Sequence, residues 1–178
     1  MIENVVLSIS ERLNEFIKNK LSINEDKVVV SNIVDAEKKL NIEVENKISI
    51  FLLNIEEEKI SKNSQFQSSP NQNPPVIINI FLMFAAHFNS INYSESLRYI
   101  SLVVEFFQIN NVFDSSNTPS LSNNIDKLYV EIANVNIDQI NMLWSNIGTN
   151  YVPSISYKIK HIKYDGNVIN EIIPKIGS

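Results

Sequence analysis

The residues from Val76 to Phe88 form an almost unbroken apolar run in which only Asn79 and His87 are polar. Such a run must be hidden from water, but it is shorter than the ~20 apolar residues that a membrane-spanning helix needs. It starts with β-branched residues directly after Pro74-Pro75, which prevent a helix from leading into it. We therefore predict a strand that is buried on both faces and lies at the centre of a sheet.

The next segment, Tyr93 to Gln108, has the spacing of a helix with two apolar faces. Asn92 and Glu95 stand at the positions of a capping box at its start. A helix that is apolar on two sides needs two partners. One is the sheet, and the other is a further element of the chain or another subunit. The two predicted faces are Leu97, Ile100, Val104 and Phe107, and Tyr99, Leu102, Val103 and Phe106.

The overall composition indicates one globular domain over residues 1–178, with 44% hydrophobic and 20% charged residues. The net charge of -5 argues against nucleic acid as a partner, because such affinity comes mainly from clustered cations. The chain has no cysteine, which excludes disulfides and thiolate metal sites. The first residues do not read as a secretory signal, so we expect assembly in the cytoplasm.

The N-terminal half predicts one more helix and two more strands. The helix is Ile2 to Lys20, and the strands are Val28 to Val34 and Ile48 to Ile55. We expect residues 35–46 to form a turn or a long hairpin loop, and residues 59–73, which are mostly polar, to form a flexible loop. The predicted polar face of the helix consists of Glu3, Ser8, Glu11, Asn14 and Lys18.

The C-terminal half predicts a half-buried strand at Leu128 to Ile132, followed by a helix and a long strand. Asn136 and Gln139 form a capping box for the helix, and Gly148 ends it. The long strand begins at Ile155, and its apolar phase slips by one residue at Ile162, as a β-bulge would produce. The remaining predictions are a helix stripe of Ile140, Leu143, Trp144 and Ile147, and a hairpin at Asp165-Gly166 into Val168 to Ile173.

The fold class that these elements predict is α/β in the broad α+β sense. It is a single domain whose mixed, mainly antiparallel sheet is flanked by about three helices.

Catalytic chemistry has little support in the sequence. Glu56-Glu57-Glu58 could raise one another's pKa, and a hydrolase could combine Glu56 or Glu58 with His87. We favour a solvated strand end for the carboxylates and hydrogen-bonded structural roles for His87 and His161, the latter on an apolar strand face. We therefore assign no catalytic, cofactor-binding or metal-binding residue.

Contacts with other proteins are the remaining class of site. Trp144 is either a binding hot spot or a core residue, because tryptophan is frequent in both settings. Lys158, Lys160 and Lys163 form a basic strip that is either a solvated strand face or a contact for acidic residues of a neighbouring subunit. The candidate partner-contact residues are Phe66, Phe106, Trp144, Tyr151, Tyr157, Lys158 and Lys160.

Five stretches follow one another in consistent order: Phe51 to Glu58, Val76 to Ala86, Ile100 to Gln108, Phe113 to Pro119, and Leu143 to Gly148 with Tyr151 to Ser154 and Tyr157-Lys158. These stretches resemble the cap proteins of extracellular contractile injection systems of the antifeeding-prophage and virulence-cassette type, and the resemblance covers nearly the whole chain. Ile78, Ile80 and Phe81 stand where that family usually has Leu and Tyr, and Lys160 stands where it usually has arginine.

The resemblance implies a structural protein with a phage tail-terminator-like fold. It would close as a hexameric ring on the last layer of the inner tube and contact the sheath, without a cofactor, nucleic acid or membrane insertion. The resemblance also implies that the loop at residues 59–73 or the chain ends could offer a strand to unpaired sheath arms. The alternative functions are a tail terminator or completion protein of a prophage and, with less support, the hydrolase.

Overall fold

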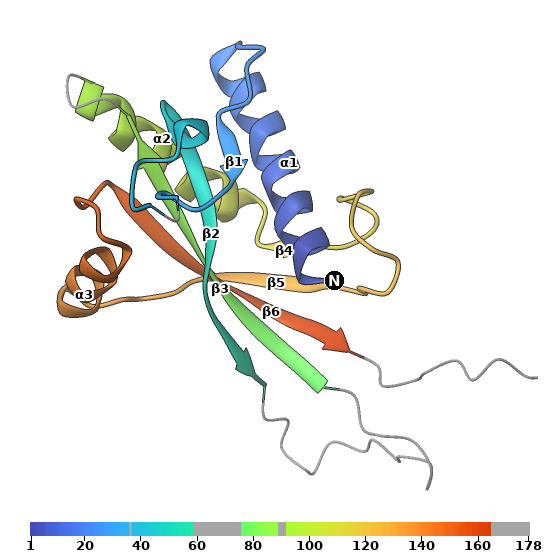
Figure 1. The fold of residues 1–178 in the computed structure, drawn as a ribbon. Helices are drawn as coiled ribbons and strands as arrows, with labels where there is room; N and C mark the ends of the chain where they lie inside the picture. Colours follow the sequence, from blue (N-terminus) through green and yellow to red (C-terminus); the bar gives the residue numbers. More distant parts are fainter. Residues whose placement is uncertain (36, 59–75, 89–91, 165–178) are drawn as a thin grey trace, which may run out of the picture.

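The computed structural model describes residues 1–35, 37–58, 76–88 and 92–164, which form one mixed sheet with three α-helices. The strand order is β1-β2-β3-β6-β5-β4, in which β1 and β2 are parallel and the other pairs antiparallel (Figure 1). This α+β architecture confirms the predicted fold class. The elements are α1 (Ile2–Leu21), β1 (Val28–Val30), the 3-10 helix η1 (Ile42–Val44), β2 (Lys47–Glu57), β3 (Val76–His87), α2 (Tyr93–Ile109), β4 (Val112–Phe113), β5 (Leu128–Ile132), α3 (Ile137–Ile147) and β6 (Ser154–Tyr164).

The apolar run predicted as the central strand is β3, which pairs with β2 on one side and β6 on the other. Its side chains alternate between two hydrophobic clusters, as the two-residue period of a strand requires. Ile80, Leu82 and Phe84 lie in the larger cluster with α1 and α2, while Met83 and Ala85 lie in the smaller cluster with α3. The prediction of a central strand buried on both faces is confirmed.

The larger cluster is organised around aromatic rings contributed by different elements. The ring of Phe107 on α2 lies 5.2 Å from that of Phe84 on β3 and 4.3 Å from that of Tyr157 on β6. Phe84 and Tyr157 also meet edge to face, at 5.8 Å. These contacts connect α2 to the middle of the sheet, so α2 and the strands beneath it pack as one unit.

The connection between β1 and β2 differs from the prediction. The two strands are parallel, with Val28 opposite Ile48, so residues 35–46 are not a hairpin loop. They begin with a turn closed by the isolated antiparallel bridge between Val34 and Leu40, which matches the predicted turn, and continue into η1. The first strand also ends at Val30 rather than Val34. Continuous runs of β-branched and apolar residues predicted two strands here, but such runs do not tell whether two strands pair in parallel or antiparallel.

The polar face predicted for α1 is only partly exposed, because Ser8 and Asn14 are buried. Asn14 connects α1 to β1. Its Nδ2 donates to the carbonyl of Val28 at 2.9 Å, and its Oδ1 accepts from the amides of Lys27 and Val28 at 2.8 and 2.9 Å. A polar residue was predicted to face water here, but its side chain instead satisfies backbone groups at the edge of the sheet.

The two predicted capping boxes have different outcomes. At α3, the Gln139 amide donates to Asn136 Oδ1 at 2.8 Å and the Asn136 amide donates to Gln139 Oε1 at 3.2 Å, so this box is confirmed. Gly148 ends α3 with φ of 83°, a left-handed conformation that favours glycine. At α2, Asn92 makes no capping hydrogen bond. Glu95 instead forms an ion pair with Arg98 at 3.6 Å.

The phase slip in the last strand is a β-bulge, as predicted. The register between β3 and β6 shifts between Ile78 and Ile80, and His161 has a φ of 71°. The bulge returns Ile162 to the buried face after His161 has turned outward. The predicted hairpin at residues 165–173 and the predicted flexible loop at residues 59–73 lie outside the described residues.

Candidate functional site

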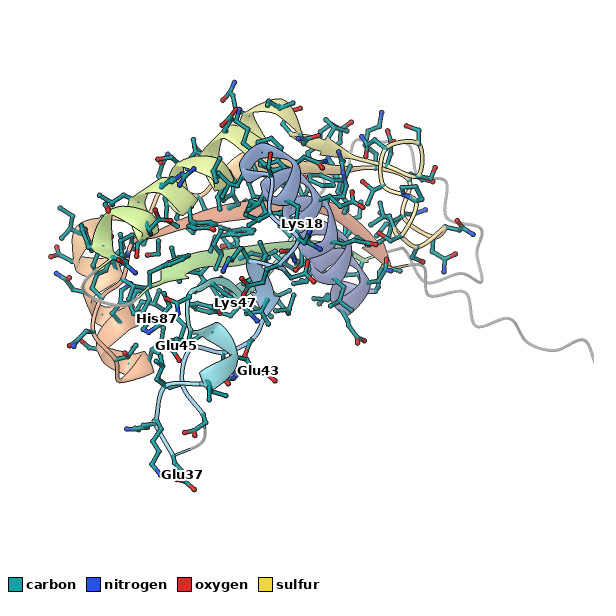
Figure 2. All side chains as sticks on the ribbon, turned by 90° about the horizontal axis from the view of Figure 1, so that it is seen from above. Lys18, Glu37, Glu43, Glu45, Lys47 and His87 are labelled. Carbon is teal, nitrogen blue, oxygen red and sulfur yellow. The ribbon has the colours of Figure 1, made fainter. Side chains whose placement is uncertain are left out.

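The hydrolase hypothesis fails on geometry, because its residues lie at opposite ends of β3. His87 is paired with Lys47, whereas Glu56 is paired with Asn79. Asn79 precedes His87 by eight residues in β3, which places the two positions about 26 Å apart along the strand. Figure 2 shows His87 near Glu45 and Lys47. These groups cannot exchange a proton within one site.

The hydrogen-bonded structural role that the sequence indicated for His87 does not hold for its Nδ1. Its Nδ1 is buried without a hydrogen-bond partner among the described residues. Burial lowers the pKa of His87 below its ordinary value, and the charge of Glu45 opposes this only in part. The imidazole is therefore neutral at neutral pH.

His161 also differs from the prediction of a residue on an apolar strand face. The bulge in β6 leaves its side chain exposed, with Nδ1 3.1 Å from the Glu58 carboxylate. Its ring meets the ring of Tyr129 edge to face at 5.4 Å. His161 thus joins β2, β5 and β6 at the surface of the sheet.

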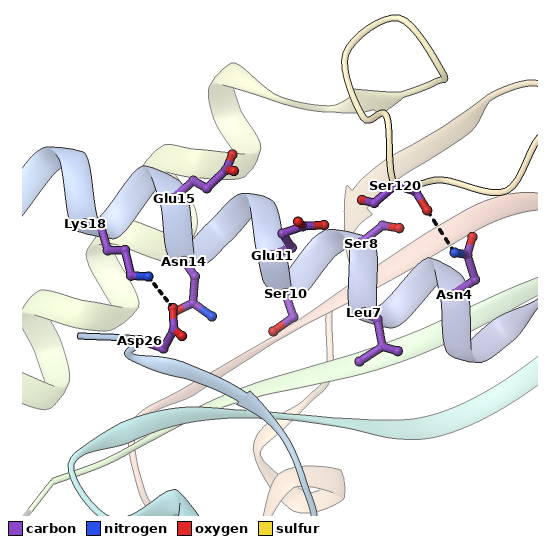
Figure 3. A pocket seen from close by; sticks show the side chains of 10 residues that line it. All are labelled: Asn4, Leu7, Ser8, Ser10, Glu11, Asn14, Glu15, Lys18, Asp26 and Ser120. Atoms are coloured by element: carbon purple, nitrogen blue, oxygen red, sulfur yellow. Dashed lines mark hydrogen bonds and ion pairs between the residues drawn. The ribbon is translucent and has the colours of Figure 1, made fainter. Parts of the chain in front are cut away.

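A hollow of about 550 Å³ runs along the outer side of α1 (Figure 3). Several of its polar groups are used within the chain: Asn4 Nδ2 donates to the carbonyl of Ser120 at 2.9 Å, and Lys18 pairs with Asp26 at 2.7 Å. The hollow contains no histidine, so no serine in it has the imidazole base of a hydrolase triad. Among the described residues, no group of three potential ligands could hold a metal ion.

The predicted partner-contact residues divide by burial. Phe106 is 1% exposed, and Trp144 and Tyr157 are each 3% exposed, so all three belong to the interior of the subunit. Trp144 is the buried residue of α3 and packs in one cluster with Ile33, which favours the core interpretation over a hot spot on the free surface. Tyr151 is exposed and its ring lies 5.7 Å from that of Trp144. Phe66 lies outside the described residues.

The predicted basic strip is neutralised largely within the chain. Lys158 lies 3.3 Å from the Glu56 carboxylate and 5.0 Å from the centre of the Phe81 ring. Lys160 lies 3.1 Å from Glu131. Ion pairs as exposed as these contribute at most about 1 kcal/mol each, but they leave the strip with little net charge to attract an acidic partner.

The family of the chain follows from its sequence over almost its full length. The family model described as the Pvc16 N-terminal domain matches residues 4–177. The chain belongs to the Pvc16 N-terminal domain family. No curated protein is similar enough in sequence to count as a match.

Two solved structures have the fold of this Pvc16 N-terminal domain. One is the sheath/tube terminator of an extracellular contractile injection system, PVC, in its extended state, with a TM-score of 0.57 and 14% identity over 94% of this chain. The other is the tube-terminating cap of the anti-feeding prophage, with a TM-score of 0.55 and 13% identity over 89% of this chain. The alignments cover 57% and 54% of those chains, so this chain spans little more than half their length.

The surface of this Pvc16 N-terminal domain carries apolar residues that sequence reasoning did not single out as contacts. Ile137 and Met142 on α3 are exposed on the same part of the chain as Tyr151. The sequence predicted the buried stripe of α3, but Ile137 and Met142 were not assigned a role. Within the described part of the chain, no helix has the length and apolar character to cross a membrane.

We expect the stability of this Pvc16 N-terminal domain to fall in strong alkali because of Tyr157. Burial raises the pKa of Tyr157 to about 12, whereas a tyrosine in the unfolded chain ionises near pH 10. The contribution of the neutral phenol is therefore complete below about pH 10 and is lost as the pH rises towards 12. Urea midpoints measured across this window should fall less steeply for Tyr157→Phe than for wild type. Parallel slopes would contradict the assignment.

Proposed function

We propose that this chain terminates the inner tube and sheath of a phage-tail-like contractile injection system, as a hexameric ring. The observation that carries the proposal is the family match over residues 4–177. It is supported by the shared fold with a sheath/tube terminator and a tube-terminating cap. A non-enzymatic role fits the separation of His87 from Glu56 by most of the length of β3.

Termination requires only a difference between the two faces of a ring. A tube grows because each layer presents the next with a copy of the surface that it has just bound. A ring that matches the tube on one face and not on the other stops this repetition. The function is therefore the exclusion of a further layer, and it needs no chemical step.

The accessible predicted contact residues are candidates for binding tube or sheath. Tyr151 is the strongest, because it is exposed and follows α3, on which Ile137 and Met142 are also exposed, and aromatic and methionine side chains are enriched in interfaces. Lys158 and Lys160 would act mainly in orienting the partner, since both are already paired with carboxylates of their own chain. Assembly in the cytoplasm precedes incorporation into the particle in this proposal.

Particles assembled without this protein are expected to have tubes of uncontrolled length or to be absent. The measurement is the length distribution of particles in electron micrographs, from producing cells with and without its gene. Supplying the wild-type chain from a plasmid should restore one narrow length distribution. Intact particles of ordinary length in the deletion strain would show that the chain is not a terminator.

A tail terminator of a prophage is the second candidate, because the anti-feeding prophage cap shares the fold. In both candidates the chain ends the growth of a tube; the second candidate ends the tail of a prophage instead of the tube of an injection system. Purification of the tagged chain from producing cells separates the two: co-purification with sheath and tube proteins of an injection system supports the first proposal.

A further inference from the structure

One outward stripe of α2 is uncharged, although Glu95, Arg98 and Glu105 flank it. Ser94, Leu97, Ser101, Val104 and Gln108 follow one another at helical spacing, and none is charged. The exposed stripe of α1, in contrast, carries Glu3, Glu11 and Glu15 around Leu7. The second partner that the sequence predicted for α2, beside the sheet, is α1, because the ring of Phe106 lies 5.5 Å from that of Phe16. No described element covers Leu97 or Val104, which are both exposed.

Beside this stripe lies a groove of about 280 Å³ between the C-terminal half of α2 and strands β5 and β6, which we call the α2 groove. Its rim includes Ile132, which is 51% exposed, and its floor includes the buried rings of Phe107 and Tyr157. The lining also includes Gln108, Asn111 and Glu131, and the Glu131 carboxylate is already paired with Lys160. Apolar and aromatic side chains are enriched in the core of an interface. The apolar lining of the α2 groove is Val104, Phe107, Val130, Ile132 and Tyr157.

The α2 groove also contains a hydroxyl that is free to bond. No described residue forms a hydrogen bond with the Tyr157 hydroxyl, although the rest of its side chain is buried. Burial keeps this phenol neutral, so it remains a hydrogen-bond donor. Tyrosine hydroxyls in such positions usually have a partner. An occupant of the groove should therefore combine apolar side chains with a hydrogen-bond acceptor.

The same chain presents such a combination elsewhere. The far ends of β2, β3 and β6 extend past the helices (Figure 1). Exposed apolar residues of β2 and β3 form a surface that we call the β-ridge, and Ile55 on it is 46% exposed. Leu52 and Ile55 lie opposite Leu82 and Ile80, and so project from the face of the sheet that α1 and α2 cover. The exposed Glu57 lies on the same face, opposite Ile78. The β-ridge consists of Leu52, Ile55 and Val76.

The backbone beside the β-ridge supplies the acceptors. In β2, the Ile48 amide and the Ile50 carbonyl bond outward, to Lys27 and Ser31. The strand period therefore directs the carbonyl of Leu52 outward too. No described strand pairs with this outer edge of β2 beyond Ile50. The edge thus offers unpaired carbonyls next to exposed apolar side chains.

We propose that the β-ridge of one copy of this chain occupies the α2 groove of the next copy, and that this contact closes the ring. Two features match across it: a projecting surface with exposed apolar residues and a recess, and an unpaired edge carbonyl and the Tyr157 hydroxyl. The proposal rests on the proposed function in that it assigns the subunit contact of that ring.

A second copy fits because the two surfaces lie on different sides of the sheet. The β-ridge is centred on β2, near one edge of the strand order, and the α2 groove adjoins β5, near the other edge. A contact between two different surfaces is heterologous, and such contacts generate closed rings or open filaments. Because each copy has a net charge of -5, copies repel one another at long range, and an apolar contact would have to supply the attraction.

The contact can be tested by cross-linking, because the chain has no cysteine of its own. The double variant Ile55→Cys/Ile132→Cys carries one thiol on each surface, at positions exposed enough to tolerate the change. Producing cells expressing only this variant would supply particles for treatment with a short bis-maleimide. We expect a ladder of covalent multimers on a denaturing gel that ends at one closed species, and loss of this ladder in each single variant.

A matched control replaces the groove position with an equally exposed residue on α3, in the variant Ile55→Cys/Met142→Cys. This control should give no ladder. Dimers from Ile132→Cys alone would indicate a symmetric contact and overturn the proposal, as would cross-links only to tube or sheath proteins. Capped particles of normal length without a ladder would overturn this contact while leaving the terminator function intact.

If the double variant fails to fold, two charge variants replace it. Ile55→Glu disables the β-ridge and Ile132→Glu disables the α2 groove, so each variant retains one competent surface. Neither variant alone should form rings, and their mixture should form dimers of one copy of each. Rings from either variant alone, or a mixture that stays monomeric while wild type forms rings, would overturn the proposal.

Discussion

Replacing Phe106 with alanine is expected to lower the free energy of unfolding by about 3–5 kcal/mol, the range for truncating a buried phenylalanine. The ring lies 4.9 Å from that of Phe107 and 5.5 Å from that of Phe16, so it connects α2 with α1. Truncation leaves a cavity that the surrounding elements can only partly close. Urea unfolding followed by the fluorescence of Trp144, the only tryptophan, would measure the change.

The control for Phe106 is Ile109→Ala on the same helix, because Ile109 is exposed and its truncation creates no cavity. Its urea midpoint should stay close to that of wild type. The comparison also separates two interpretations of Phe106. A residue that served only as a partner contact would leave the stability of the isolated chain unchanged when truncated, and that result would contradict its place in the core.

Replacing Asn14 with alanine is expected to lower the free energy of unfolding by about 2–4 kcal/mol. The change removes three hydrogen bonds and leaves backbone groups of Lys27 and Val28 without this partner, and each such buried group costs about 1–3 kcal/mol. The same urea titration measures it. Because alanine favours helix more than asparagine does, any loss of stability would come from the contact with β1.

Asn19→Ala is the matched control for Asn14, since Asn19 is an exposed asparagine on the same helix. It should be neutral or slightly stabilising through its gain in helix propensity. Equal effects of the two variants would mean that the bonds between Asn14 and β1 do not hold α1 on the sheet.

The sequence predicted correctly those elements whose pattern of residues is the same whichever elements pack against them. The apolar run of β3 has few polar residues whichever strands flank it, and the Asn136–Gln139 box acts within one helical turn. The phase slip near Ile162 is visible because a bulge adds one residue to a two-residue period. Each of these signals is local, and each prediction is confirmed.

The candidate site depended on long-range contacts that the pattern does not encode. Lys158 and Lys160 are an open basic strip in the sequence, but Glu56 and Glu131 from other strands neutralise them. Phe106 and Val104 are both apolar residues of α2, yet the first is buried and the second is exposed. Which face of α2 meets the sheet depends on how α1 packs beside it.

The sequence by itself determined where the three helices and most of the strands lie, which strand is central, and which family the chain resembles. Only the tertiary structure decided that β1 and β2 are parallel, that Asn14 faces inward, and that His87 is far from Glu56. The physical reason is that periodicity reports which side chains avoid water, whereas burial of a given residue depends on the element that covers it.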